Sequence, residues 1–173
     1  MKKVIFIILI QFSGCTAPKS TYQTEDFTCY PKAVYLFRHA EKQVIKGEDN
    51  PELTKAGFVR SNALAEAMTD ISAGLIYSSE YARTQQTAAP LAKQWSTDIN
   101  IKTAKDPEAQ VDIALANCNQ HVIIVGHSNT IPNLISLFGV VEEITIEDNQ
   151  YGDLFIIEWE NAKPQLRIEY VGE

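Results

Sequence analysis

The apolar residues of the chain gather in short runs that are separated by stretches with helical spacing. The runs are rich in β-branched and aromatic residues, so each predicts a buried or edge strand. Because only a few residues around Pro164 separate the last two runs, we expect these to form an antiparallel hairpin. The predicted strands are 33–37, 74–77, 99–101, 121–126, 154–159 and 166–170.

Helices are expected between the strands. Thr54 is a suitable N-cap for the first, and Asp106 followed by Pro107 indicates the start of the third. The apolar stripe expected on the first helix consists of Phe58, Leu64, Ala65 and Met68. The other predicted helices are 81–95, where Pro90 is expected to kink or divide the helix, 107–116, and 128–138, which Gly139 ends. Alternating strands and helices predict a mostly parallel sheet with helices on both faces.

The first residues follow the pattern of an export signal. Lys2 and Lys3 precede an apolar run at 4–10, which is too short to span a bilayer. The small residues Ser13 and Gly14 before Cys15 resemble the lipobox of bacterial lipoproteins, in which the signal peptide is cut before a lipid-carrying cysteine. The alternative is a plain secretory signal in which Cys15 has no role.

The lipoprotein interpretation divides the chain into three parts. We expect a signal peptide at 1–14, a lipid-attached tether at 15–28 that begins with the lipidated Cys15, and a folded domain at 29–173. The expected location is outside the cytoplasm, anchored to the membrane on the periplasmic side.

Length and charge narrow the classes of function. The chain has 173 residues, which suits one domain with a sizeable core. Its net charge is -7, so we expect no nucleic-acid partner, because binding to a phosphate backbone needs a basic surface. A small phosphorylated substrate remains compatible, since a pocket can be locally positive on an acidic protein.

Charged residues that follow predicted strands indicate the chemistry. Arg38 and His39 end the first strand, Arg83 follows the second, and His127 follows the strand 121–126. In a parallel sheet, ligands bind beyond the carboxyl ends of the strands. Arginine grips phosphate oxygens and histidine forms covalent intermediates, so the set predicts phosphoryl chemistry. We expect no metal or other cofactor, because cationic side chains supply the charge that a metal would bring.

Four segments resemble the histidine phosphatase (phosphoglycerate-mutase-like) superfamily. They are Arg38-His39-Ala40-Glu41, Leu53-Thr54-Lys55-Ala56-Gly57, the segment 77–88 around Arg83, and Val125-Gly126-His127-Ser128. The resemblance implies a three-layer α/β/α sandwich with a mostly parallel sheet. It implies that His39 is the phosphorylated nucleophile and that Arg38, Arg83 and His127 complete the phosphate pocket. The departure is Ala40, where glycine is commonest, and alanine is tolerable there unless the backbone needs a positive φ.

The proton donor is the least determined part of the predicted site. In much of the family it is an acid in the segment that corresponds to Asp106 and Glu108. We favour Glu108, because Asp106 is suited to cap a helix. Glu41 and Glu80 are further candidates. The alternative for Asp106 and for Glu108 is an acid on the solvated surface with no role in catalysis.

Two smaller predictions accompany these. Ser128 and Asn129 are expected to help bind the substrate's anionic group through their backbone N–H groups, or else to cap the following helix. In the family fold the two histidine-bearing strands are parallel neighbours, so Cys29 and Cys118 fall near the same end of adjacent strands. We therefore expect a Cys29–Cys118 disulfide, with two free thiols as the alternative.

The leading hypothesis is a metal-independent phosphatase that hydrolyses a phosphomonoester through a phosphohistidine on His39. One alternative is a catalytically weak lipoprotein that binds a phosphorylated ligand. The other is a phosphomutase, which we disfavour because only 44 residues separate Arg83 from His127, whereas mutases of the family usually carry longer insertions.

Overall fold

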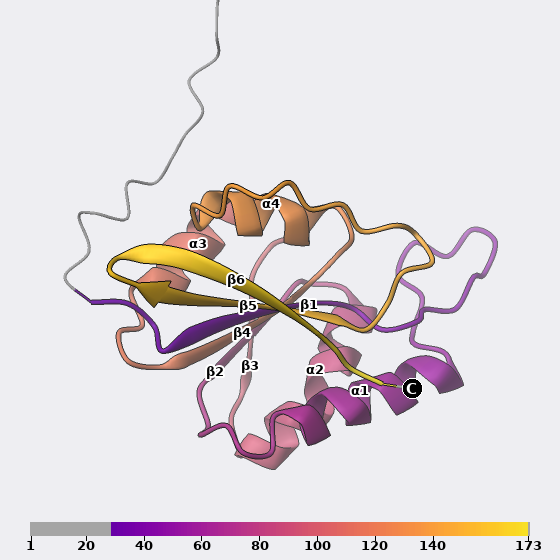
Figure 1. Cartoon of the computed structure of the whole chain (residues 1–173). Coiled ribbons are helices and arrows are strands. Elements are labelled where there is room, and N and C mark those ends of the chain that lie inside the picture. Colours follow the sequence, from indigo (N-terminus) through magenta and orange to yellow (C-terminus); the bar gives the residue numbers. More distant parts are fainter. Residues whose placement is uncertain (1–28, 173) are drawn as a thin grey trace, which may run out of the picture.

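A six-stranded sheet between two pairs of helices makes up the folded domain (Figure 1). The computed structural model describes residues 29–172. The predicted signal peptide, Cys15 and the predicted tether therefore lie outside the described residues. The elements are β1 (Ala33–Arg38), α1 (Lys55–Ala67), β2 (Leu75–Ser78), α2 (Ala82–Trp95), β3 (Ile99–Ile101), α3 (Pro107–Leu115), β4 (His121–Gly126), α4 (Thr130–Leu137), β5 (Asp153–Glu160) and β6 (Lys163–Tyr170).

The strand order β3-β2-β4-β1-β5-β6 confirms the predicted mostly parallel α/β sandwich. Strands β3, β2, β4 and β1 run parallel, whereas β5 and β6 form an antiparallel hairpin at one edge. In the register of β1 and β4, Ala33 lies opposite His121 and Arg38 lies opposite Gly126. The two strands therefore end together, and the residues that follow them emerge side by side.

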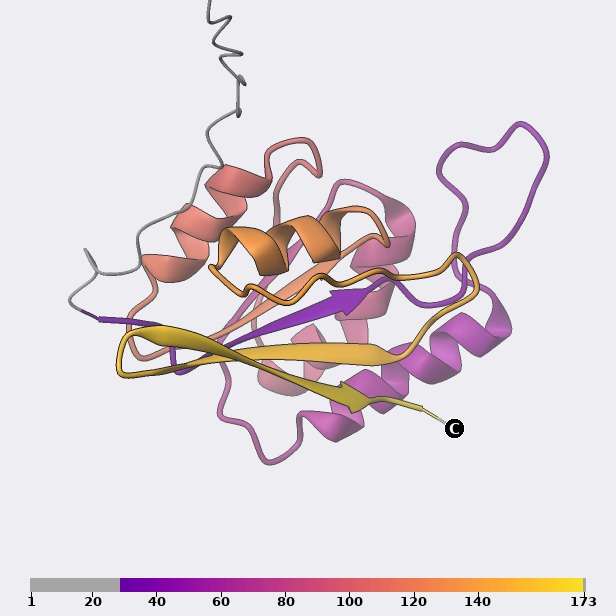
Figure 2. The ribbon, with the colours of Figure 1, turned by 45° about the horizontal axis from the view of Figure 1, so that its top comes forward.

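Helices cover both faces of the sheet. Helices α3 and α4 lie on one face and α1 and α2 on the other, which is clear when Figures 1 and 2 are compared. Strand β1 alternates between the two cores, with Val34 and Leu36 packing on the first side and Tyr35 and Phe37 on the second. Because both faces are covered, β1 is buried throughout and β4 is buried from Val122 onward, which explains their continuous apolar runs.

The apolar stripe predicted for α1 is wrong at Phe58. That side chain is 43% exposed, and the polar residue Ser61 is fully buried instead. The Ser61 hydroxyl lies 2.9 Å from the carbonyl oxygen of Gln86, the carbonyl that would accept from residue 90 in a regular helix. Pro90 has no N–H to donate, so Ser61 satisfies this carbonyl and α2 continues through the proline.

Other local predictions are confirmed. Thr54 Oγ1 accepts from the N–H of Gly57 at 3.1 Å, and Asp106 caps α3 through the N–H of Ala109 at 3.0 Å. Gly57 leaves space for the backbone after His39, since a Cβ there would lie 2.3 Å from the Glu41 carbonyl oxygen. The hairpin turns on Asn161 and Ala162, both with positive φ, as in a two-residue type I′ turn.

The start predicted for the last helix is two residues too early. Helix α4 begins at Thr130, and the side chain of Asn129 makes no capping hydrogen bond. Instead the Thr130 hydroxyl accepts from the N–H of His127 at 2.9 Å, which fixes the turn between β4 and α4. Across residues 29–172 we find no helix with the length and apolar character needed to cross a membrane.

Candidate active site

A cavity of about 390 Å³ lies at the carboxyl ends of β1, β2 and β4. Its lining includes all four residues that the sequence analysis placed in a phosphate pocket: Arg38, His39, Arg83 and His127. The backbone N–H of His39 donates to the Gly126 carbonyl at 2.9 Å, so the pairing of β1 with β4 extends to the first histidine. As a result the two imidazole rings lie with centroids 5.3 Å apart.

His39 is held in one tautomer. Its Nδ1 lies 2.8 Å from the carbonyl oxygen of Ala40, and a carbonyl only accepts, so Nδ1 carries the hydrogen. Burial lowers the pKa of His39 to about 3, and the neighbouring cationic groups act in the same direction. The ring is therefore neutral at neutral pH, and Nε2 holds a lone pair that can attack an electrophile.

Ala40 is compatible with this arrangement. Its side chain is buried, its N–H donates to Thr87 Oγ1 at 2.9 Å, and its φ is not positive. The replacement of the family's usual glycine therefore needs no unusual backbone conformation.

His127 is held by a chain of hydroxyl groups. Thr84 Oγ1 donates to the Tyr81 carbonyl at 2.8 Å and is 2.8 Å from Ser79 Oγ, which is in turn 2.9 Å from Nε2 of His127. The assignment that satisfies every group has Ser79 donating to Thr84 and accepting from the Nε2–H of His127. Burial lowers the pKa of His127 to about 4, so this ring is also neutral at neutral pH.

The two arginines each leave a buried donor without a partner. Within residues 29–172, four buried side-chain nitrogens lack a hydrogen bond, and two of them are Nε of Arg38 and Nε of Arg83. The guanidinium of Arg38 lies 4.3 Å from the centroid of the Tyr151 ring, and that of Arg83 lies 4.3 Å from the Tyr81 centroid. Unpaired buried N–H groups are costly, so two of them in one cavity indicate an anion site.

Arg38 is oriented by the segment that precedes β5. Its Nη1 donates to the carbonyls of Glu147 and Gln150, both at 2.7 Å, and its Nη2 donates to the carbonyl of Asp148 at 3.0 Å. The end of the guanidinium is thereby occupied. The edge formed by Nε–H and the remaining Nη2–H stays available, and such an edge binds two phosphate oxygens at once.

None of the four acids proposed from the sequence as proton donor lines the cavity. Glu108 is exposed in the first turn of α3 and does not line the cavity, so the preference for Glu108 as proton donor is not supported by its position. Asp106 caps the same helix. Glu41 is paired with Arg60 at 2.7 Å, and Glu80 accepts from the N–H of Ala104 at 2.9 Å.

Some lining residues were identified from the sequence and others were not. Ser128 and Asn129 do line the cavity, although they precede α4 rather than forming its first turn. The sequence analysis missed the residues that loops bring to the cavity: Lys42, Lys105 and Asp148. These residues occur in loop segments without apolar periodicity, so no pattern in the sequence distinguishes them from surface charges.

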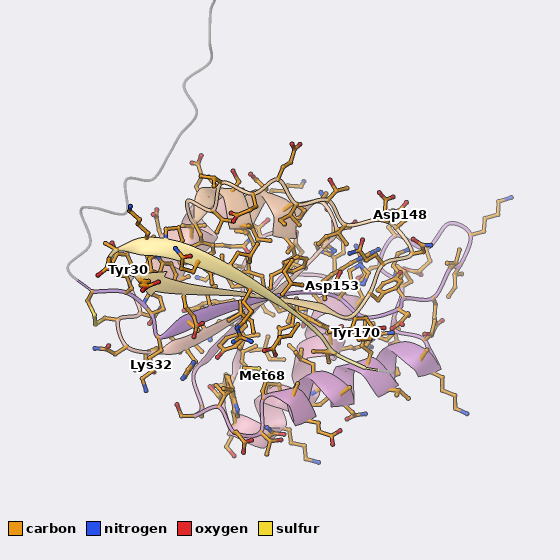
Figure 3. The ribbon with its side chains drawn as sticks, in the orientation of Figure 1. Tyr30, Lys32, Met68, Asp148, Asp153 and Tyr170 are labelled. Carbon is orange, nitrogen blue, oxygen red and sulfur yellow. A yellow bond between two sulfur atoms is a disulfide. The ribbon has the colours of Figure 1, made fainter. Side chains whose placement is uncertain are left out.

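The disulfide lies at the other end of the sheet. The structure joins Cys29 to Cys118, the pair named in the sequence analysis, with their Cα atoms 5.4 Å apart. Figure 3 shows Tyr30 and Lys32, close to Cys29 in the chain, at the opposite end of the molecule from Asp148. The bond therefore holds the amino ends of β1 and β4, away from the cavity.

Fold and cavity together define an α/β sandwich with an anion site made of two arginines and two histidines. The family model described as "Histidine phosphatase superfamily (branch 1)" matches residues 34–106, which include Arg38, His39 and Arg83. No curated protein sequence matches the chain significantly.

Solved structures share the fold at low identity. A phosphoserine phosphatase from Entamoeba histolytica is 16% identical, with a TM-score of 0.63 over 82% of this chain and 97% of that one. A protein assigned as the phosphohistidine phosphatase SixA from Agrobacterium tumefaciens is 22% identical, with a TM-score of 0.63 over 83% and 100% of the two chains. A mycobacterial glucosyl-3-phosphoglycerate phosphatase is 12% identical, with a TM-score of 0.61 over 81% and 98%. At these identities the structures show the fold alone, and that fold is phosphoglycerate-mutase-like.

Proposed function

We propose that this protein is a metal-independent phosphatase that hydrolyses a phosphomonoester through a phosphohistidine on His39. The observation that carries the proposal is the pair of unpartnered Nε–H groups of Arg38 and Arg83 in one cavity with a neutral histidine. A phosphoryl group fits this set, because its oxygens accept from both arginines while its phosphorus faces an imidazole nitrogen.

The reaction has two steps. Nε2 of His39 attacks phosphorus, the bond from phosphorus to the ester oxygen breaks, and the leaving oxygen takes a proton to become an alcohol. Water then attacks the phosphohistidine, the P–N bond breaks, and inorganic phosphate leaves with His39 neutral again. Arg38 and Arg83 stabilise the charge on the phosphoryl oxygens in both steps, and His127 lines the pocket beside them.

The lining of the cavity favours a substrate with a second negative charge. Lys42 and Lys105 lie at the cavity in addition to the two arginines, although the protein as a whole is acidic. One structural neighbour was solved with 3-phosphoglyceric acid and another with phosphoserine, which both carry a carboxylate beside the phosphate. We therefore infer that phosphorylated acids are better substrates than phosphate esters of neutral alcohols.

A substrate panel tests the activity. The purified protein is expected to release phosphate from p-nitrophenyl phosphate in the presence of EDTA. It is expected to show a kcat/KM about tenfold higher for phosphoserine and 3-phosphoglycerate than for glycerol phosphate, because each ion pair with a lysine contributes roughly 1 kcal/mol at a partly exposed site. Phosphate binding without release from any ester would instead support a binding lipoprotein.

We also propose that the protein is exported and held on the membrane by a lipid on Cys15. The supports are the signal-like segment 1–14 and the Cys29–Cys118 bond, since structural disulfides persist in oxidising compartments. A Cys15→Ser variant is expected to move from the membrane fraction to the soluble periplasmic fraction, because it lacks the thiol that carries the lipid. Wild type and Cys15→Ser in the same fraction would contradict the lipid anchor.

A further inference from the structure

Among residues 29–172, Asp148 is the one acidic residue that lines the cavity. It belongs to the segment between α4 and β5, and Figure 3 shows it at the end of the molecule where that segment passes the loops after the strands. The residue is exposed to solvent as well as lining the cavity. Such a position suits a proton donor, because the leaving group points away from the nucleophile in an in-line displacement.

The other candidate acids have positions or partners that do not suit proton donation. Arg60 binds the Glu41 carboxylate with Nε at 3.0 Å and Nη2 at 2.7 Å. Burial alone raises the pKa of Glu41, but the hydrogen bonds from Arg60 hold that pKa below its usual value. Glu41 is therefore ionised at neutral pH. Glu80 does not line the cavity, and its carboxylate accepts from the Ala104 N–H next to Lys105.

Asp148 is connected to the phosphate site through Arg38. The carbonyl oxygen of Asp148 accepts from Nη2 of Arg38 at 3.0 Å, and the flanking carbonyls of Glu147 and Gln150 accept from Nη1. Tyr151, which directly follows Gln150, stacks on the same guanidinium and lies 6.3 Å from the His39 ring, centroid to centroid. One arginine thus places both the phosphoryl oxygens and the backbone that bears the carboxyl group.

We propose that Asp148 is the general acid that protonates the leaving oxygen, an inference that rests on the phosphatase activity proposed above. In the first step the Asp148 carboxyl gives its proton to the ester oxygen as the P–O bond breaks and the P–N bond to His39 forms. In the second step the Asp148 carboxylate takes a proton from the attacking water as the P–N bond breaks. The carboxyl group is then restored, and phosphate leaves.

A leaving-group comparison tests this role. The Asp148→Asn variant is expected to lose about a hundredfold or more in kcat/KM with glycerol phosphate, whose alkoxide leaving group needs a proton. With p-nitrophenyl phosphate, whose phenolate leaves without one, kcat/KM is expected to stay within about threefold. Because Arg38 binds only the backbone carbonyl of residue 148, the substitution leaves that contact in place. The Asp148→Glu variant is expected to recover part of the glycerol phosphate activity.

Glu143→Gln is the matched control, since Glu143 is an exposed acid of the same segment between α4 and β5 and does not line the cavity. This variant is expected to hydrolyse both substrates at the wild-type rate. Equal losses on both substrates in Asp148→Asn, or no loss on either, would overturn the assignment of Asp148 while leaving the phosphatase in place. Absence of hydrolysis by the wild-type protein would overturn the proposed function, and the role of Asp148 with it.

Discussion

The His39→Ala variant is expected to lose at least about a thousandfold in kcat/KM for p-nitrophenyl phosphate. The variant removes the nitrogen that forms the covalent intermediate. A water molecule in its place is a weaker nucleophile than the neutral imidazole, which the Ala40 carbonyl holds in position and in one tautomer. A residual rate is expected from the arginines, which still bind and polarise the phosphoryl group. Steady-state kinetics measure the loss, and samples quenched in alkaline denaturant are expected to show a base-stable, acid-labile phosphoprotein in wild type only.

His121 offers a matched control, because it is the one histidine among the described residues that does not line the cavity, and it lies at the amino end of β4, 3.4 Å from the Tyr35 hydroxyl. The His121→Ala variant is expected to keep kcat/KM within about twofold of wild type. Circular dichroism separates loss of chemistry from loss of fold, since His39→Ala should retain the wild-type spectrum. Unchanged turnover in a folded His39→Ala protein would refute His39 as the nucleophile.

Loss of the Cys29–Cys118 bond is expected to give the largest change in stability. The bond closes a loop with a sequence separation of 89 residues, and cross-links of that length stabilise a fold by about 2–4 kcal/mol. For a domain of this size, that corresponds to a melting temperature lower by roughly 5–15 °C. Thermal unfolding of the Cys29→Ala/Cys118→Ala variant against wild type measures the effect.

Reductant gives an independent comparison for the same prediction. Added reductant is expected to lower the melting temperature of wild type and to leave that of the double variant unchanged. Activity at 25 °C is expected to stay near the wild-type value in the double variant, since the bond lies at the end of the sheet away from the cavity. Equal melting temperatures for wild type and the double variant would contradict the stabilising role.

The centre of the site was predictable because its histidines come directly after buried strands in the chain. The apolar runs that form β1 and β4 continue without interruption up to Arg38-His39 and Gly126-His127. The end of each apolar run therefore locates both the end of the strand and the candidate catalytic residues. The caps Thr54 and Asp106 were predictable for a similar reason, since each is satisfied by an N–H three residues away.

Predictions failed where a tertiary contact replaced a local preference. Phe58 has the hydrophobicity of a core residue, but α1 packs closely on α2 and buries Ser61, whose hydroxyl satisfies the carbonyl that Pro90 leaves free. Asp148 was missed because its place depends on Arg38, 110 residues earlier in the chain, whose hydrogen bonds to that segment go to backbone carbonyl groups. Every residue has a backbone carbonyl, so the residue types in the sequence do not indicate such hydrogen bonds.

The position of the disulfide has a consequence for how the domain meets a membrane. The bond fixes residue 29 at the amino end of β1, and the cavity lies past the carboxyl end of that strand, about 20 Å or more away along its six residues. With a lipid on Cys15, the attachment point would face the bilayer and the cavity would open toward the aqueous compartment. Such an orientation favours soluble phosphate esters over the phosphorylated head groups of the lipids that hold the protein.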